Sequence, residues 1–401
     1  MKKRRISLII VMIMVLSLIG FVVACDNKTD PTGTTAPQGV GTDPAGSETE
    51  APADPTDDKT PDGQIQVGIV LPTKDEPRWL QDQAQFEKIL SSAGFTNETL
   101  FSQGKPDVEK TNVESLVNKG IKVLIICAHD AKAAAATVAA AKAEGVTIIA
   151  YDRLITDTEA VDYYVTFDSV QVGKMQGQYL VDNAAGEGQP LYLYAGAATD
   201  NNAFLFFEGA WSVLQPAIAE GKFVIANSAE AEALKDKAEL TREEISKIIG
   251  QVTTDWDFNV AKSKAEANLS AADEEMKGDV AILAPNDGTA RSIADTFAGD
   301  ADITSYMITG QDSEKASVQY IIDGKQSMTV FKDTRTLAAD SVAMAVDILG
   351  DKTPATDAEY DNGVKQVPSK QSPIVAVTKD NVKEALIDSE YYVAGDFTGL
   401  D

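Results

Sequence analysis

Apolar residues in this chain occur in short uninterrupted runs, and segments of mixed polarity separate the runs. Residues 121–127 and 146–150 are two such runs, with an alanine-rich segment between them. A strand that helices cover on both faces of a parallel sheet has this continuous apolar pattern. The pattern therefore predicts one βαβ unit over residues 121–153.

The same alternation continues along the chain from residue 64. It predicts strands at residues 64–71, 95–101, 163–167, 189–194, 223–225, 280–283, 305–309, 327–331, 364–368 and 375–378, and helices at residues 79–93, 107–118, 171–183, 204–219, 263–276, 290–297 and 336–349. Residues 72–78 and 197–202 are expected to be polar loops, and residues 227–250 predict one or two surface helices. This order of elements favours the α/β class with parallel sheets.

The chain is long enough for two such domains. Its 401 residues exceed the roughly 250–300 residues above which one core usually gives way to two, so we expect two α/β lobes. The formal net charge is −27, and no basic patch offsets it. We therefore expect no nucleic-acid partner, because binding to phosphates needs clustered Lys and Arg.

The first 25 residues have the pattern of an export signal. Four basic residues at positions 2–5 precede a mostly apolar stretch at 6–23, and small residues lead to Cys25. This ending resembles a bacterial lipobox, whose cysteine is acylated after cleavage. We expect a signal peptide at residues 1–24 and a lipid anchor on Cys25 that holds the protein at the membrane without a spanning helix. An uncleaved signal anchor is the alternative.

Residues 26–63 are rich in Pro, Gly, Thr, Ala and acidic residues and contain almost no large apolar side chain. Such a composition buries too little apolar surface to offset the entropy of ordering. Together with Cys25, this segment is predicted to be a disordered tether over residues 25–63. Cys127 is the only other cysteine, and we expect it to pack as a small apolar side chain.

Polar residues follow several of the apolar runs at the point where each predicted strand ends. They are Asp152 and Arg153, Asn201 and Asn202, Asn286 and Asp287, Gln311 and Asp312, and Lys332. The carboxyl edge of an open parallel sheet is where such folds bind ligands. Each pair alone is also typical of helix capping or turns, but the recurrence at one edge favours a shared binding site.

This set of side chains suits a neutral polyhydroxylated ligand. A sugar hydroxyl donates to carboxylates and accepts from Arg, Lys and Asn, and the apolar face of a pyranose ring can pack on the indoles of Trp79 and Trp256. Trp211 lies near Phe206 and Phe207 on a helical face and is expected in the core.

Signatures of catalysis and of cofactor binding were not found. The chain lacks a dinucleotide-binding glycine motif after its first strand, a phosphate-binding loop, a nucleophile elbow and a zinc-type Cys/His cluster. His129, the only histidine, is expected to line the cleft without a catalytic or metal-binding role. We therefore expect no enzyme, no cofactor and no metal. An extracellular glycoside hydrolase with paired carboxylates is the enzymatic alternative, but no barrel pattern supports it.

Several motifs occur together in order along the chain. They are the residues 150–155 with sequence AYDRLI, 200–203 with DNNA, 286–288 with NDG, 310–312 with GQD and 331–335 with FKDTR. From residue 64 to the C-terminus this series resembles the type I periplasmic sugar-binding proteins, and within them the xylose-binding and multiple-monosaccharide-binding branch that serves ABC importers. The segment at 227–250 is an insertion relative to that pattern.

The resemblance implies two Rossmann-like lobes joined by a three-segment hinge. The N-terminal lobe would comprise residues 64–168 and 333–369, and the C-terminal lobe residues 169–332 and 370–401. Site residues carried over by motif are Arg78, Trp79, Asp152 and Arg153 in the first lobe, Asn201, Asn202, Trp256, Asp287 and Asp312 in the second, and Lys332 at the hinge.

The resemblance also implies a function and partners. The chain would be a monomeric extracytoplasmic receptor that closes over an aldose such as xylose, glucose, galactose or arabinose and delivers it to an ABC permease. The alternative is a binding protein of the same fold for a nucleoside or a signalling ligand, which feeds a chemoreceptor or sensor kinase. A sugar-responsive repressor is disfavoured by the export signal and by the lack of an N-terminal helix-turn-helix.

Overall fold

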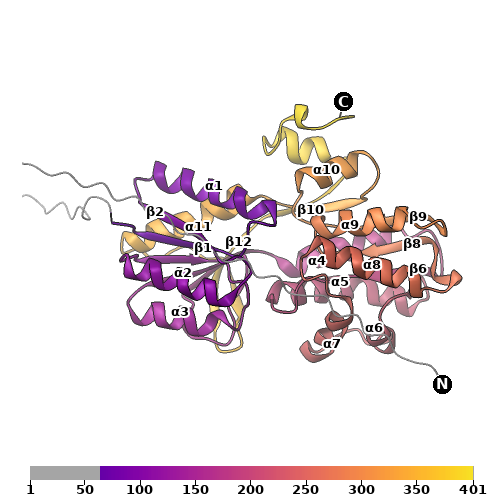
Figure 1. The fold of residues 1–401 in the computed structure, drawn as a ribbon, viewed down its shortest axis with the longest axis horizontal. Coiled ribbons are helices and arrows are strands. Elements are labelled where there is room, and N and C mark those ends of the chain that lie inside the picture. Colours follow the sequence, from indigo (N-terminus) through magenta and orange to yellow (C-terminus); the bar gives the residue numbers. More distant parts are fainter. Residues whose placement is uncertain (1–63, 401) are drawn as a thin grey trace, which may run out of the picture. The chain divides into compact units, whose positions relative to one another are not determined.

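The computed structural model describes residues 64–400 (Figure 1). The predicted signal peptide, the Cys25 anchor and the tether up to residue 63 lie outside these residues. Within residues 64–400, every helix is too short or too polar to cross a bilayer.

The first sheet has seven strands, and all but its edge strand β11 run parallel. In spatial order the strands are β11 (Ala358–Asp361), β12 (Gln366–Ser372), β5 (Tyr163–Phe167), β4 (Thr147–Tyr151), β3 (Val123–Ile126), β1 (Val67–Leu71) and β2 (Asn97–Phe101). In Figure 1 the late strand β12 lies beside strands from the start of the fold, so distant segments complete one sheet.

Helices cover both faces of this sheet, which explains its uninterrupted apolar strands. Alternate residues such as Leu124 and Ile126 pack with α2 (Pro106–Asn118) and α3 (Ala134–Ala143), whereas Val123 and Ile125 pack with α1 (Pro77–Ser92) and α11 (Thr334–Leu349). Both sets are fully buried. Cys127 lies in the second of these cores as a free buried thiol, as expected for a small apolar side chain.

The second sheet has four parallel strands. They are β7 (Phe223–Ile225), β6 (Gln189–Leu193), β8 (Gly278–Leu283) and β9 (Ile303–Ile308), and one face is covered by α5 (Asn201–Ala219), α6 (Ala229–Ala233) and α7 (Arg242–Val252), the other by α8 (Phe258–Ala271) and α9 (Asp287–Ala298). Trp211 is buried in the core beneath α5, as predicted. The two mostly parallel, helix-covered sheets confirm the α/β prediction.

Further elements connect or flank the two sheets. They are α4 (Ser169–Asp182), which packs along α5, the short helix α10 (Lys315–Ile322), and the antiparallel pair β10 (Met328–Lys332) and β13 (Ile374–Thr378). After β10 the chain returns to the first sheet, where α11 packs against α1. The predicted lobe boundaries near Asp168, Lys332 and Ser369 stay a prediction, and β12 continues in the first sheet to Ser372, three residues past the third boundary.

Helices α4 and α5 approach so closely that only glycine fits at the contact. A Cβ atom on Gly173 would collide with the carbonyl oxygen of Phe206, and one on Gly209 with that of Val170. The contact holds the connection out of β5 against the first helix of the second sheet.

The predicted starts of three helices that carry site residues were wrong in the same direction. Helices α1, α5 and α9 begin earlier than expected, so Arg78, Asn201, Asn202 and Asp287 lie in first helical turns and not in loops. The reason is N-terminal capping: the side chains of Asp200 and Asn286 accept hydrogen bonds from backbone N–H groups of the first turn, and Pro77 opens α1.

The insertion at residues 227–250 contributes to α6 and α7. A capping box formed by Thr241 and Glu244 begins α7. The prediction of purely surface helices was incomplete, because Ile245, Ile248 and Ile249 on α7 are buried in the core of the second sheet. This element is therefore part of the folded lobe.

Candidate functional site

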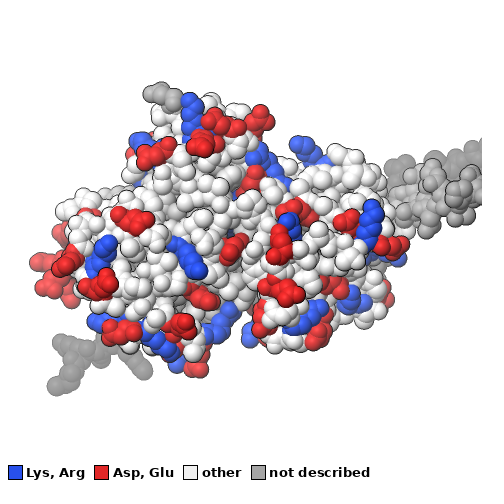
Figure 2. Space-filling model, turned by 180° about the vertical axis from the view of Figure 1, so that it is seen from behind, with Lys and Arg blue, Asp and Glu red and all other residues white. Residues whose placement is uncertain are grey.

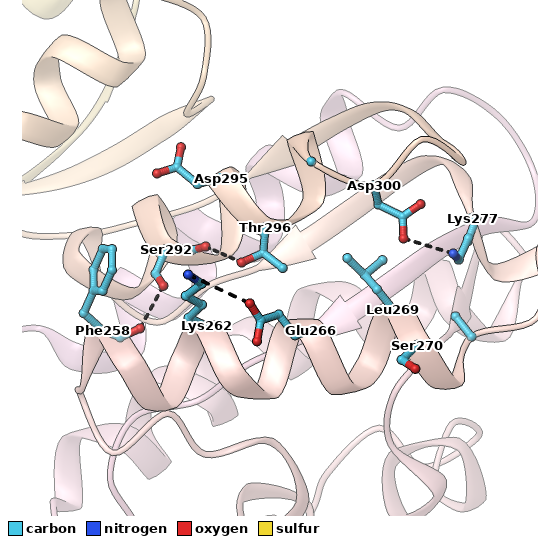
Figure 3. Close-up of a pocket in the computed structure, with 12 residues that line it drawn as sticks. Phe258, Lys262, Glu266, Leu269, Ser270, Lys277, Ser292, Asp295, Thr296 and Asp300 are labelled. Atoms are coloured by element: carbon cyan, nitrogen blue, oxygen red, sulfur yellow. Dashed lines mark hydrogen bonds and ion pairs between the residues drawn. The ribbon is translucent and has the colours of Figure 1, made fainter.

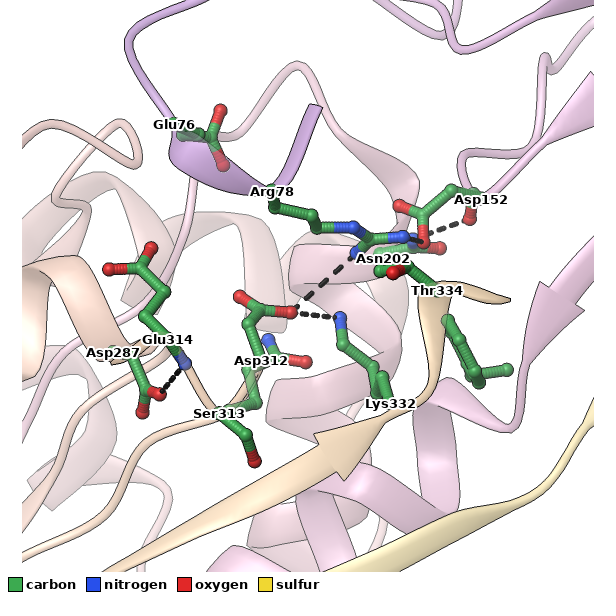
Figure 4. Close-up of polar contacts among 12 residues, drawn as sticks. Glu76, Arg78, Asp152, Asn202, Asp287, Asp312, Ser313, Glu314, Lys332 and Thr334 are labelled. Atoms are coloured by element: carbon green, nitrogen blue, oxygen red, sulfur yellow. Dashed lines mark hydrogen bonds and ion pairs between the residues drawn. The ribbon is translucent and has the colours of Figure 1, made fainter. Parts of the chain in front are cut away.

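Four charged side chains, from the start of α1, the end of β4, the loop after β9 and the end of β10, meet at one point (Figure 4). Arg78 donates from Nη2 to Asp152 at 2.5 Å, and its Nη1 lies 3.6 Å from Asp312. Lys332 Nζ lies 2.7 Å from the same Asp312 oxygen. All four side chains are at most 9% exposed. The carboxyl ends of β4, β9 and β10 and the start of α1 thus present alternating charges to one another.

Asp152 links the first sheet to helix α5. Its backbone carbonyl accepts hydrogen bonds from Asn202 Nδ2 at 2.8 Å and from the Tyr164 hydroxyl at 2.7 Å. Burial acts to raise the pKa of Asp152, but Arg78, Lys332 and Arg153 outweigh it and hold the pKa below its ordinary value. Asp152 is therefore a carboxylate acceptor.

A second link between the sheets lies beside the first. Arg153 Nε forms a buried ion pair with Asp200 at 2.9 Å. Nη2 of the same guanidinium lies 3.8 Å from the carboxylate of Glu76. Burial raises the pKa of both Asp200 and Glu76, against the lowering effect of Arg153.

The backbone at the site is in an uncommon conformation. Asp152, Asp312 and Trp256 have φ angles of 61°, 95° and 61°, in the region that costs a residue with a side chain about 1 kcal/mol or more. Each follows a strand or helix end, and each carries a side chain predicted to face the ligand. Such strain is typical of functional sites, where the surrounding structure fixes the backbone.

The two tryptophans lie in different surroundings. Trp79 is 1% exposed, and the guanidinium carbons of Arg78 and Arg153 lie 4.5 and 5.3 Å from its ring centroid. Trp256 packs edge-on against Phe206 at a centroid distance of 6.2 Å and covers Gly196, where a Cβ would strike its ring. Trp256 lines a cavity of about 140 Å³ together with Arg153, Glu76 and, as predicted, His129.

Asp287 and Asn201 have partners inside the second lobe. Asp287 is 0% exposed, and its carboxylate accepts hydrogen bonds from Gln326 Nε2 at 2.7 Å and from the backbone N–H of Glu314 at 2.9 Å. Burial raises the pKa of Asp287 well above its ordinary value. Asn201 accepts from Arg242 Nη1 at 2.8 Å. Asp287 thus supports the loop that carries Asp312, and Asn201 connects the site to α7.

Comparison with known proteins decides the family. A family model described as a periplasmic binding protein domain matches residues 67–353. The chain is 38% identical over 338 residues to the multiple sugar-binding periplasmic receptor ChvE of Rhizobium radiobacter, covering 82% of this chain and 91% of that protein. It is 36% identical over 340 residues to the multiple sugar-binding periplasmic protein SbpA of Azospirillum brasilense, covering 82% and 90%.

This chain belongs to the periplasmic binding protein family. Among solved structures, a carbohydrate transporter solute-binding protein of Chloroflexus aurantiacus in complex with D-glucose is 66% identical, with a TM-score of 0.83 and coverage of 84% of this chain and 99% of that one. An ABC transporter solute-binding protein of Clostridium phytofermentans with bound β-D-glucose is 33% identical, with a TM-score of 0.73 and coverage of 82% and 99%.

Membership confirms the family that the motifs indicated, and with it the type I periplasmic binding protein fold. Periplasmic binding proteins are extracytoplasmic solute receptors and not a class of enzymes. Within residues 64–400, no group of three or more His, Cys, Asp or Glu side chains could hold a metal ion. On the face of this binding protein in Figure 2, acidic and basic side chains are interspersed.

Several residues of the site were not foreseen from the sequence. They are Glu76, Asp82, Tyr164, Asp200 and Arg242. A signal existed for two of them: Asp82 follows Arg78 at the i, i+4 helical spacing, and Asp200 has the residue type and position of a helix cap. Tyr164 and Arg242 reach the site only through the tertiary fold.

This binding protein has a separate groove between α8 and α9 (Figure 3). Lys277 pairs with Asp300 and Lys262 with Glu266, while Ser292 donates to the carbonyl of Phe258. These polar groups already satisfy one another, and none of the predicted ligand-binding residues lines the groove.

Proposed function

We propose that this periplasmic binding protein is a receptor that binds a monosaccharide between its two sheets and delivers it to an ABC importer. The observation that carries the proposal is the contact between Arg78 on α1, Asp152 after β4, Asp312 after β9 and Lys332 at the end of β10, all almost fully buried. Matched donors and acceptors of this kind suit a neutral ligand that both donates and accepts.

The contacts in this site suggest a role for each residue that the family motifs singled out. Asp152 and Asp312 accept from sugar hydroxyls, while Arg78, Arg153, Asn202 and Lys332 donate to sugar oxygens. Trp256 offers its ring face, and its buried indole N–H, which has no hydrogen-bond partner within residues 64–400, donates as well. The ring of Trp79 packs against the guanidinium groups of Arg78 and Arg153. Asn201 and Asp287 contribute from the second lobe through the contacts described above.

Sugar binding is coupled to closure in this proposal. A ligand that contacts both sheets stabilises the arrangement in which they approach, and therefore shifts the population of the protein toward it. The contacts of Asn202 with Asp152 and of Asp200 with Arg153 join the sheets in the same arrangement. The lobe boundaries at residues 168, 332 and 369 then act as the hinge.

The proposed ligand is an aldose: glucose, xylose, galactose or arabinose. A solved structure with 66% sequence identity is described as a complex with D-glucose, and two relatives are named multiple sugar-binding proteins. A lipid anchor on Cys25 is proposed to hold the receptor at the cell membrane, next to its permease. A chemoreceptor or sensor kinase is a further proposed partner.

Calorimetric titration of the purified protein with each of the four aldoses tests the proposal. We expect saturable heat with at least one aldose and none with adenosine, which represents a nucleoside ligand of the same fold. Heat with adenosine alone would favour the alternative, and no heat with any aldose would refute sugar binding.

A further inference from the structure

A buried carboxylate that no motif singled out lies behind the charged cluster. Asp82 is on α1, one turn after Arg78, and is 0% exposed. Its Oδ2 lies 3.4 Å from Arg78 Nε, and its Oδ1 accepts a hydrogen bond from the Tyr151 hydroxyl at 3.0 Å. Asp82 therefore touches the side of Arg78 that faces away from Asp312.

The three nitrogens of the Arg78 guanidinium each face a different carboxylate. Nε faces Asp82, Nη2 faces Asp152 and Nη1 faces Asp312. A guanidinium is planar, so fixing its Nε edge also fixes the directions of both terminal nitrogens. The ring of Trp79 below the plane, 4.5 Å from Cζ, restricts the remaining rotation.

We propose that Asp82 is a positioning residue for sugar binding: its ionised carboxylate, held by Tyr151, orients Arg78 so that the terminal nitrogens of Arg78 reach both sheets and the ligand. This inference rests on the proposed function, because it assigns Asp82 to the same site. Asp82 acts through Arg78 and touches no ligand.

The charge on Asp82 changes near neutral pH. The pKa of Asp82 is raised to about 7, and burial is the largest cause. Asp152 also raises this pKa, whereas Arg78 and the hydrogen bond from Tyr151 lower it. Tyr391 from the C-terminal segment also lies within electrostatic range of Asp82. Protonation removes the negative charge that holds the Nε edge of Arg78. Sugar affinity therefore falls as the pH drops through about 7.

The test is calorimetric titration of the full-length protein with D-glucose, or with whichever of the four aldoses binds, at several pH values from 6 to 8. If only the ionised form binds well, the affinity falls about tenfold between pH 8 and pH 6, because one proton is linked to binding. Asp82→Asn should bind at least tenfold more weakly than the wild type at pH 8 and show no pH dependence between 6 and 8.

A second variant separates positioning from folding. Tyr151→Phe removes a hydrogen bond that lowers the pKa of Asp82. It should keep the pH dependence and move its midpoint upward. Thermal unfolding shows whether each variant is folded. Glu109→Gln is the control, because burial raises the pKa of Glu109 to about 7 as well, while within residues 64–400 its carboxylate accepts hydrogen bonds only from Ser102 and the backbone N–H of His129; it should retain the wild-type profile.

The outcomes are distinguishable. A wild-type affinity that does not change from pH 6 to 8, or an Asp82→Asn variant with wild-type affinity and profile, would overturn the inference. A wild type that binds no sugar would instead refute the proposed function. In that case a crystal structure of Asp82→Asn decides the positioning role, since an unmoved Arg78 side chain contradicts it and a rotated one supports it.

Discussion

Asp152 makes its two connections through different atoms. Its carboxylate pairs with Arg78, and its carbonyl accepts from Asn202 and Tyr164. The left-handed backbone at this residue turns the carbonyl toward α5 while the side chain faces Arg78. One residue thus combines a proposed ligand contact with a contact between the sheets.

Replacing Asp152 by Ala should reduce sugar affinity at least about 100-fold, equivalent to roughly 3 kcal/mol. Arg78 loses its shortest ion pair, and buried donors are left without an acceptor. Calorimetry with the best aldose measures the loss.

Asp130→Ala is the matched control, because Asp130 also follows a strand of the first sheet but caps the turn before α3. This variant should keep its sugar affinity. Wild-type affinity in Asp152→Ala would show that the binding site lies elsewhere.

Sequence reasoning located residues that lie at strand ends or in the loops that follow them, because the carboxyl ends of neighbouring strands bring these residues together. It located Asp152, Asp312 and Lys332 for that reason. It did not anticipate that Asp287 is fully enclosed, because the early start of α9 turns this side chain toward Gln326 and Glu314. Side-chain direction depends on the capping of a helix within one residue, which periodicity does not resolve.

At the scale of elements, the strands with uninterrupted apolar runs were all predicted. The edge strand β11 (Ala358–Asp361) and the short helix α10 were missed. The sequence of β11 is AEYD, which contains no apolar run because an edge strand is only partly covered. Eight-residue α10 has little more than two turns in which a helical period could be recognised.

The contact between α4 and α5 makes a prediction that distinguishes two helical glycines. Gly209→Ala should destabilise the protein by about 2–4 kcal/mol, because the new methyl group strikes the carbonyl of Val170 and forces the helices apart. Gly250→Ala in α7 meets no neighbouring atom within 4 Å and should stabilise the protein by up to about 1 kcal/mol. Denaturant unfolding measures both changes; equal effects would contradict the close contact.

At the scale of the whole molecule, the formal charge of −27 disfavours anionic ligands, while the site itself combines positive and negative groups. A neutral aldose has no net charge, so the negative charge of the protein neither attracts nor repels it. Its affinity is therefore set by short-range hydrogen bonds in a buried site, which salt screens little.

We expect the affinity for the best neutral aldose to change less than about twofold between 20 mM and 500 mM NaCl. If galactose binds, galacturonate should bind at least about tenfold more weakly, because its carboxylate meets Asp152, Asp312 or Glu76. Galacturonate shares the ring and hydroxyl configuration of galactose, so it is a matched comparison. Calorimetry at the two salt concentrations checks both statements. A preference for the acid would show that the cationic groups dominate the site.

The pairing of β5 with β12 affects how the protein folds while it is being synthesised. Strand β5 ends at Phe167, and its partner begins at Gln366. During synthesis at about 5–20 residues per second, the two are separated by on the order of 10–40 seconds. For that time β5 is an uncovered edge that can pair with other chains. We therefore expect this edge to stay open to such pairing until β12, in the last tenth of the chain, has emerged.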